Sequence, residues 1–194
     1  MPSSVARLVA QDHDRLLRLL RRMCAPGPNQ ERWRGEFLRL LRAHRAAERD
    51  ELFPSVVAQL PERSDTVRRQ AEDDVALDRL AAEVEAADIW ADGFADLCSR
   101  ADAGIRGHAD ALWSAVLDTL EQTVGRKEVR RLGGSYERRR DDELRARGDH
   151  EPPPRRLDLS RAELYELARR AGVEGRSSMS REQLIDELLR RSPH

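Results

Sequence analysis

Apolar side chains recur every three or four positions through most of the first 124 residues, which is the period of an amphipathic α-helix. The run breaks at the turn-forming stretches APGPN and ADG (91–93), and Ser3 or Ser4 is a suitable N-cap for the first helix. The pattern therefore predicts four helices, which run from the N-cap to about Cys24, from about Gln30 to Leu60, from about Glu62 to Ile89, and from Phe94 to about Val124.

Short turns join these four predicted helices. Pro54 falls inside the second one, where it is expected to kink or break the helix. Amphipathic helices joined in this way pack as an up-down-up-down four-helix bundle. The sequence thus predicts an all-α fold with such a bundle over residues 1–125.

The pattern changes after Gly125. Residues 126–157 are dense in charge and contain a Gly-Gly pair and three consecutive prolines, which predicts a fraying helix followed by an extended linker. Residues 158–194 are amphipathic again, and Ser160 with Glu163 and Ser180 with Gln183 match capping boxes. This last segment is predicted to be a small helix–loop–helix module.

Charge and cysteine usage narrow the functional classes. Residues 1–125 hold 17 basic and 22 acidic side chains, a net charge of −5, whereas residues 126–194 have a net charge of +4, so the tail is the part suited to a polyanion. Cys24 and Cys98 are far apart in sequence and form no disulfide framework, which predicts free thiols in a reducing cytoplasm. The start lacks the apolar core of a signal peptide, and no apolar run is long enough to cross a membrane, so no membrane partner is expected.

Three of the five histidines occupy apolar stripes. His13, His44 and His108 each lie near the middle of a different predicted helix, and Glu48 follows His44 by one turn on the same stripe. Burying imidazoles and a carboxylate is costly unless they are paired or bind a cation. Imidazoles with a carboxylate suit iron, manganese or zinc. The other interpretation is a set of satisfied core histidines, with Glu48 paired to His44 or to an arginine.

Two segments resemble a known family. DHDRLLRLL around His13 and HRAAERDELFP from His44 to Pro54 are similar to the motifs of the hemerythrin-like (HHE cation-binding) family, and the likeness covers residues 5 to 124. The resemblance implies a four-helix bundle with a non-haem di-iron site. It implies His13, His44 and His108 as metal ligands and Glu48 as a metal-bridging carboxylate.

The sequence departs from the family pattern at two places. Asp74, with Asp78 one turn on, stands where the third helix of the family carries histidine, and Asp74 is the candidate replacement ligand. Leu112 and Trp113 stand where the fourth helix should carry an acidic ligand. One bridging carboxylate is therefore missing, and the site is expected to hold one or two iron ions, with zinc or manganese as alternatives.

The tail has a resemblance of its own. ELYELARRAGVEGRSSMSREQLIDELL is similar to the small helical module at the N-terminus of transcription termination factor Rho. The likeness implies contact with nucleic acid, for which Arg176 and Arg181 near the loop are the candidate phosphate-binding residues. A module that only contacts other proteins is the alternative.

Two functions remain open at this level. The first is a non-haem iron protein that senses dioxygen, peroxide or nitric oxide, or that handles iron. It is not expected to be an enzyme, because no nucleophile–base pair appears in the sequence. The second is a metal-free helical scaffold whose C-terminal module binds nucleic acid or a protein partner.

Overall fold

The structure is a computed structural model and describes residues 4–27, 29–146 and 161–190. Within these ranges every regular element is a helix, which confirms the predicted all-α class. The α-helices are α1 (Val5–Cys24), α2 (Gln30–Ala47), α3 (Phe53–Gln59), α4 (Ser64–Ala86), α5 (Phe94–Leu112), α6 (Asp118–Thr123), α7 (Arg126–Ala146), α8 (Arg161–Arg170) and α9 (Arg181–Arg190).

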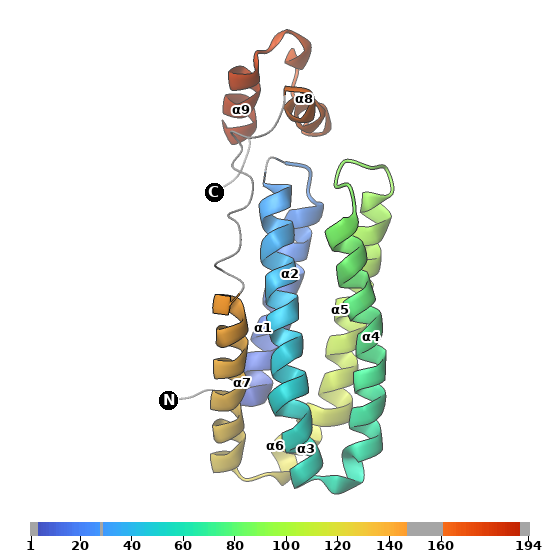
Figure 1. Ribbon diagram of the computed structural model, residues 1–194, viewed down its shortest axis with the longest axis vertical. Helices are drawn as coiled ribbons and strands as arrows, with labels where there is room; N and C mark the ends of the chain where they lie inside the picture. The colour runs from blue at the N-terminus through green and yellow to red at the C-terminus, as the bar shows by residue number, and fades with distance from the viewer. Residues whose placement is uncertain (1–3, 28, 147–160, 191–194) are drawn as a thin grey trace.

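The long helices α1, α2, α4 and α5 lie side by side, and α7 packs along α1 and α2 (Figure 1). Ser4 caps α1, since its hydroxyl accepts a hydrogen bond from the backbone N–H of Arg7. That bond satisfies one of the N–H groups that a helix leaves without a partner at its first turn.

A buried polar layer divides the core of these helices. One apolar cluster contains Val9, Ala47, Val67 and Leu112. A second cluster, with Leu16, Leu41, Leu77 and Ile105, lies nearer the opposite end of the same helices. Between the two clusters, these helices and the turn that follows α2 bury a set of polar side chains, namely Asp12, His13, His44, Glu48, Gln70, Asp74 and His108. Because burial of polar groups is costly, this layer is the part of the fold that packing alone does not explain.

Two π-helical turns follow the buried histidines. Glu48–Leu52 continues α2 directly into α3, and Trp113–Leu117 continues α5 into α6. In the first turn the N–H of Phe53 donates to the carbonyl of Glu48, five residues back. Pro54, which has no N–H, therefore widens the helical ladder and does not break it, and the second predicted helix runs on to Gln59.

The prediction of free cysteines is wrong. Cys24, the last residue of α1, forms a disulfide with Cys98 in the first turns of α5, with the two Cα atoms 6.0 Å apart. The long sequence separation concealed this pairing, because only the packing of α1 against α5 brings the two positions together. Because the two cysteines are paired, reduced thiols no longer support the expectation of a cytoplasmic location.

The segment 126–146 was predicted as a fraying helix at the start of a charged linker, but it does not fray and packs against α1 and α2. It forms the continuous helix α7, and Val129, Leu132, Gly133 and Tyr136 make a buried stripe at helical spacing. Val129, Leu132 and Tyr136 complete the first apolar cluster. The remainder of the predicted linker, residues 147–157, lies outside the described residues.

The helices α8 and α9 pack on each other around a third apolar cluster, as expected for a helix–loop–helix module. Trp90, between α4 and α5, packs against this cluster, and the guanidinium of Arg170 donates to the carbonyl of Ile89 at 2.8 Å. None of the helices in the described ranges combines the length and apolar character needed to cross a membrane.

Candidate metal centre

Four side chains from three helices converge in the polar layer. The ligand atoms that His13, His44, Glu48 and His108 can offer all lie within 4.8 Å of one another. His44 Nε2 lies 3.0 Å from His13 Nε2 and 3.4 Å from His108 Nε2. Glu48 Oε1 lies 2.9 Å from His44 Nε2 and 3.1 Å from His108 Nε2. Every member of the group is buried, and His44 and Glu48 have no exposed surface.

This spacing fits a single ion. A tetrahedral ion bound to nitrogen or oxygen at about 2.0–2.1 Å holds its donors about 3.3 Å apart. Four of the six separations among these donors, 2.9 to 3.4 Å, are close to that value, and the whole set lies within 4.8 Å. Three imidazoles and a carboxylate form a donor set that transition metals accept. The buried group can thus hold a metal ion.

The charges of the centre are strongly coupled. Burial is the largest influence on Glu48 and opposes its charge, but the neighbouring His44 and His108 hold the pKa of its carboxyl well below the usual range. Burial also opposes charge on the two histidines. Yet Glu48, helped by the hydrogen bonds of each ring, raises the pKa of His44 and raises that of His108 to about 9. Burial and the charge of His44 lower the pKa of His13 to about 2.

Asp74 lies behind His108. Its Oδ1 accepts a hydrogen bond from His108 Nδ1 at 2.7 Å, and the Gln70 amide lies 3.3 Å from the same oxygen. Its Oδ2 accepts from Arg45 Nη1 at 2.5 Å. Asp74 was predicted as a ligand, but the structure places it as the hydrogen-bond partner of His108 and outside the converging group. A carboxylate in this position keeps the proton of His108 on Nδ1 and leaves Nε2 to face the centre.

Arg45 was not singled out from the sequence. Its Nη1 also donates to Glu48 Oε2 at 2.8 Å, so one guanidinium bridges Glu48 and Asp74. The exposed Asp78 forms a further ion pair with Arg45, with its Oδ1 3.7 Å from Arg45 Nε. A fixed cation therefore lies directly beside the four converging donors.

A second network, also not singled out from the sequence, lies behind His44. The hydroxyl of Tyr136 is 2.6 Å from His44 Nδ1 and 3.0 Å from Asp12 Oδ2. Arg140 Nη1 donates to Asp12 Oδ1 at 2.9 Å. Tyr136 and Arg140 belong to α7, so the helix outside the predicted bundle reaches the centre. The helical spacing of Val129, Leu132 and Tyr136 is the sequence signal that could have revealed it.

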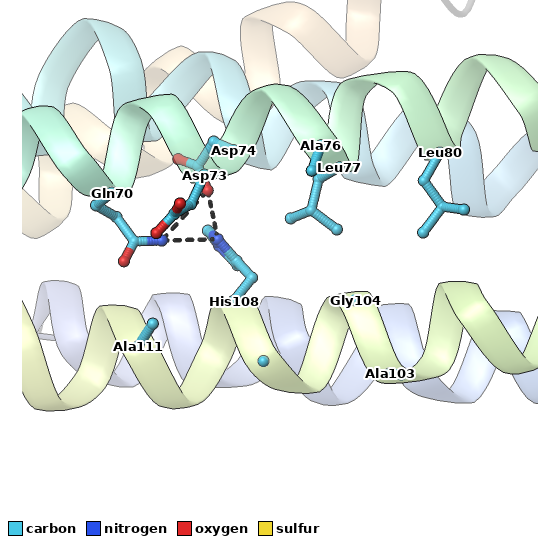
Figure 2. Close-up of a pocket in the computed structure, with 11 residues that line it drawn as sticks. Gln70, Asp73, Asp74, Ala76, Leu77, Leu80, Ala103, Gly104, His108 and Ala111 are labelled. Carbon is cyan, nitrogen blue, oxygen red and sulfur yellow. Dashed lines mark hydrogen bonds and ion pairs between the residues drawn. The ribbon is translucent and has the colours of Figure 1, made fainter.

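A cavity of about 270 Å³ opens between α4 and α5 next to the centre. Figure 2 shows Gln70, Asp74 and His108 meeting at one end of it, while Leu77 and Leu80 extend from α4 over the other. The α5 wall is made of small residues, among them Gly104 and Gly107. A Cβ added at Gly104 would lie 3.1 Å from Leu80 Cδ2 and 3.2 Å from Leu77 Cδ2, so this glycine lets α4 and α5 approach closely beside the cavity.

Leu112 and Trp113, the two residues that depart from the family pattern, lie at the end of α5 and in the turn that follows it. Leu112 is completely buried in the first apolar cluster, and Trp113 is 47% exposed. Neither offers a donor to the centre. These two positions therefore supply no carboxylate of the kind that the resemblance predicted.

The candidate nucleic-acid residues lie in the C-terminal module. Arg176 is half-buried, donates to the carbonyl of Val173 at 3.0 Å and lies over the ring of Tyr165. Its guanidinium is thus engaged within the module. Arg181 begins α9. Phosphate binding by either residue stays a prediction.

Compared with protein-family models, with curated proteins and with solved structures, the chain shows no match. The resemblance to hemerythrin-like proteins, and that of the tail to the Rho module, stay predictions from the sequence. What the geometry itself establishes is a buried histidine and glutamate group that could bind a metal ion.

Proposed function

We propose that this protein binds one divalent transition-metal ion, in the first place iron, through His13, His44, His108 and Glu48. The ion serves to sense or handle a small ligand such as dioxygen, peroxide or nitric oxide, and the protein is not a turnover enzyme. The observation that carries this proposal is the convergence of four buried donor atoms within 4.8 Å of one another. Zinc and manganese are the alternative ions for this donor set.

The proposal of a single ion rests on Arg45. A second ion bridged by the other oxygen of Glu48 and by Asp74 would need the space and the charge that the guanidinium already supplies. Leu112, on α5, offers no donor atom for a second ion. A fixed positive charge in that position neutralises both carboxylates without metal.

The arrangement of α1, α2, α4 and α5 supports an up-down-up-down four-helix bundle of hemerythrin-like type. Along α1 the chain passes from the first apolar cluster through His13 to the second, and along α2 it returns through His44. The helices α4 and α5 repeat this reversal around Asp74 and His108. Such bundles build their metal sites from side chains that project inward from facing helices.

The cavity between α4 and α5 supports a small ligand. It is mostly apolar, His108 is part of its lining, and its volume of about 270 Å³ is more than a molecule of a few heavy atoms requires. A bound ion would supply Lewis acidity and open coordination positions, while the protein residues fix the imidazoles and exclude bulk water.

Elemental analysis of protein purified without a polyhistidine tag and reconstituted anaerobically with ferrous iron tests the proposal. We expect about one ion per chain and a rise in melting temperature on loading, because the ion binds only the folded state. Glu48→Gln keeps the shape of the side chain but removes its charge. It should abolish both the bound ion and the rise in melting temperature.

Glu72→Gln is the matched control, because Glu72 is exposed on α4 and lies outside the converging group. It should behave as the unaltered protein. About two ions per chain would contradict the role given to Arg45. A folded protein that takes up no iron, zinc or manganese would refute the metal proposal.

One observation favours the second function, a metal-free scaffold. Protons on His44 and His108, together with Arg45, can neutralise Glu48 and Asp74 without an ion. In that case the tail module carries the function, through nucleic acid or a protein partner. The same experiment separates the two functions, since the scaffold gains no stability from metal in either the unaltered or the Glu48→Gln protein.

A further inference from the structure

The helix α7 brings a single hydroxyl group into the interior of the four-helix assembly. Tyr136 is completely buried, and its hydroxyl contacts both His44 Nδ1 and Asp12 Oδ2. Asp12 is in turn held by Arg140, one turn further along α7. No other tyrosine lies near the centre, because Tyr165 belongs to α8.

The donor and acceptor capacities of these groups fix the order of the hydrogen bonds. An ionised carboxylate only accepts, so Tyr136 donates its one proton to Asp12. The phenol oxygen must then accept from His44, which places the proton of the imidazole on Nδ1. Consequently the lone pair of the neutral ring lies on Nε2, the atom that faces His13, His108 and Glu48.

We propose that Tyr136 is a positioning residue for the metal centre: with Asp12 it holds His44 in the tautomer whose Nε2 binds the ion, and so makes α7 part of the site. This inference rests on the proposed metal binding and specifies which residues beyond the ligands determine affinity. Partners of metal-bound histidines of this kind change metal affinity by about 10- to 100-fold when they are removed.

Substitutions of Tyr136 and of Asp12 disrupt the hydrogen bonds to His44 in different ways. Tyr136→Phe keeps the ring and its packing and removes only the acceptor of the His44 proton. Asp12→Asn keeps the volume but replaces an obligate acceptor with a group that can also donate. The proton of Tyr136 is then free to point at His44 Nδ1, which favours the opposite tautomer.

The experiment is a titration of the metal-free, full-length protein with zinc and with cobalt(II), for the unaltered chain, each single variant and the double variant. We expect each single variant to bind about 10- to 100-fold more weakly. The double variant should bind no more weakly than the weaker single variant, because either change already breaks the same chain of hydrogen bonds. The visible absorption of bound cobalt(II) should change in the same variants.

Tyr165→Phe and Asp14→Asn are the matched controls, since Tyr165 lies in the C-terminal module and Asp14 is exposed on α1. Both should bind zinc as the unaltered chain does, and the melting temperatures of all metal-free variants show whether each one folds. If the unaltered chain binds zinc but Tyr136→Phe and Asp12→Asn bind it within about twofold, the inference is wrong and the metal site stands. Losses that add up in the double variant would also overturn it, since they indicate two independent effects on packing. If the unaltered chain binds no metal, the proposed function fails and this inference fails with it.

Discussion

His13 and His108 have opposite pKa shifts although both rings line the same centre. Burial is the largest influence on each. For His13 the charge of His44 adds to it, and the pKa falls to about 2. For His108 the charge of Glu48 and the hydrogen bond to Asp74 outweigh burial, and the pKa rises to about 9. The contributions of these two imidazoles to the stability of the fold therefore change in opposite directions with pH.

This difference predicts the pH dependence of the metal-free protein. His108 holds its proton in the folded state up to about pH 9, whereas an unfolded histidine releases it near 6.5, so this contribution to stability is lost as pH rises through that window. His13 stays unprotonated in the folded state down to about pH 2, so its contribution is lost as pH falls below 6.5. Each group changes the free energy of unfolding by at most about 1.4 kcal/mol per pH unit. We expect stability to peak near pH 6.5 in urea denaturation measured from pH 5 to 9.

His108→Gln provides the internal check on this profile. The groups that face His108 are Glu48 from the end of α2, Asp74 from α4, and the rings of His13 and His44. Without the imidazole, the decline above pH 6.5 should become shallower. Stability that keeps rising from pH 6.5 to 9 in the metal-free protein would contradict the prediction.

The four converging residues could be predicted from the sequence because each falls on an apolar stripe, where a polar side chain is conspicuous. Their partners could not. Asp12, Arg45 and Tyr136 contact residues on other helices, and which neighbours they meet depends on how the helices rotate and pack. Asp74 shows the same limit: its buried position was visible in the pattern, but only the packing of α4 against α5 decides that it contacts Nδ1 of His108 rather than the centre.

At the scale of elements, the disulfide joins α1 to α5 at one end of the molecule. Cys24 and Cys98 are separated by 74 residues, and closing a loop of that length lowers the entropy of the unfolded chain. The loop-entropy estimate is a stabilisation of about 4 kcal/mol at 25 °C. We expect reduction to lower the free energy of unfolding by up to this amount, measured by urea denaturation with and without a phosphine reductant.

The Cys24→Ser/Cys98→Ser protein serves as the reference for this measurement. It should match the reduced protein and should not respond to the reductant. Its metal affinity should equal that of the unaltered chain, because each cysteine lies about 15 Å along its helix from the nearest histidine of the centre. Equal stability of oxidised and reduced protein would show that the disulfide does not constrain the unfolded state.

The sequence pattern predicted the positions of α1, α2, α4 and α5 because long amphipathic stripes and turn residues define them. It was less informative where polar content masks a stripe. In α7, arginines and acidic residues surround Val129, Leu132 and Tyr136, so the segment was predicted only as a fraying helix that leads into a linker, although these three buried side chains dock it against the first apolar cluster. Pro54 was another such case, since the π-helical turn before it accommodates the missing N–H without ending the helix.

At the scale of the whole molecule, the proposed metal binding should be coupled to the docking of α7. The helix is attached through its apolar stripe, through Tyr136 and Arg140, and through the ion pair of Arg139 with Asp50. If Tyr136 stabilises the metal-binding form of His44, the bound metal must stabilise docked α7 to the same extent. We expect zinc to slow amide hydrogen exchange in α7, as measured by mass spectrometry of the full chain.

The helices α8 and α9 are the control region, because neither supplies a residue to the centre. Their exchange should not change with zinc. In Tyr136→Phe the protection of α7 by zinc should shrink or vanish. Unchanged exchange in α7 of the unaltered, zinc-loaded protein would show that the helix and the metal centre are independent.

The complete burial of His44 and Glu48 would limit how fast the proposed ion exchanges. Neither side chain meets solvent while the surrounding helices stay packed, so an ion bound as proposed would be released only through a local opening. Such openings are rarer than the fluctuations of a surface site. Loaded and empty molecules would therefore interconvert slowly, and the loaded fraction would lag behind changes in the metal supply.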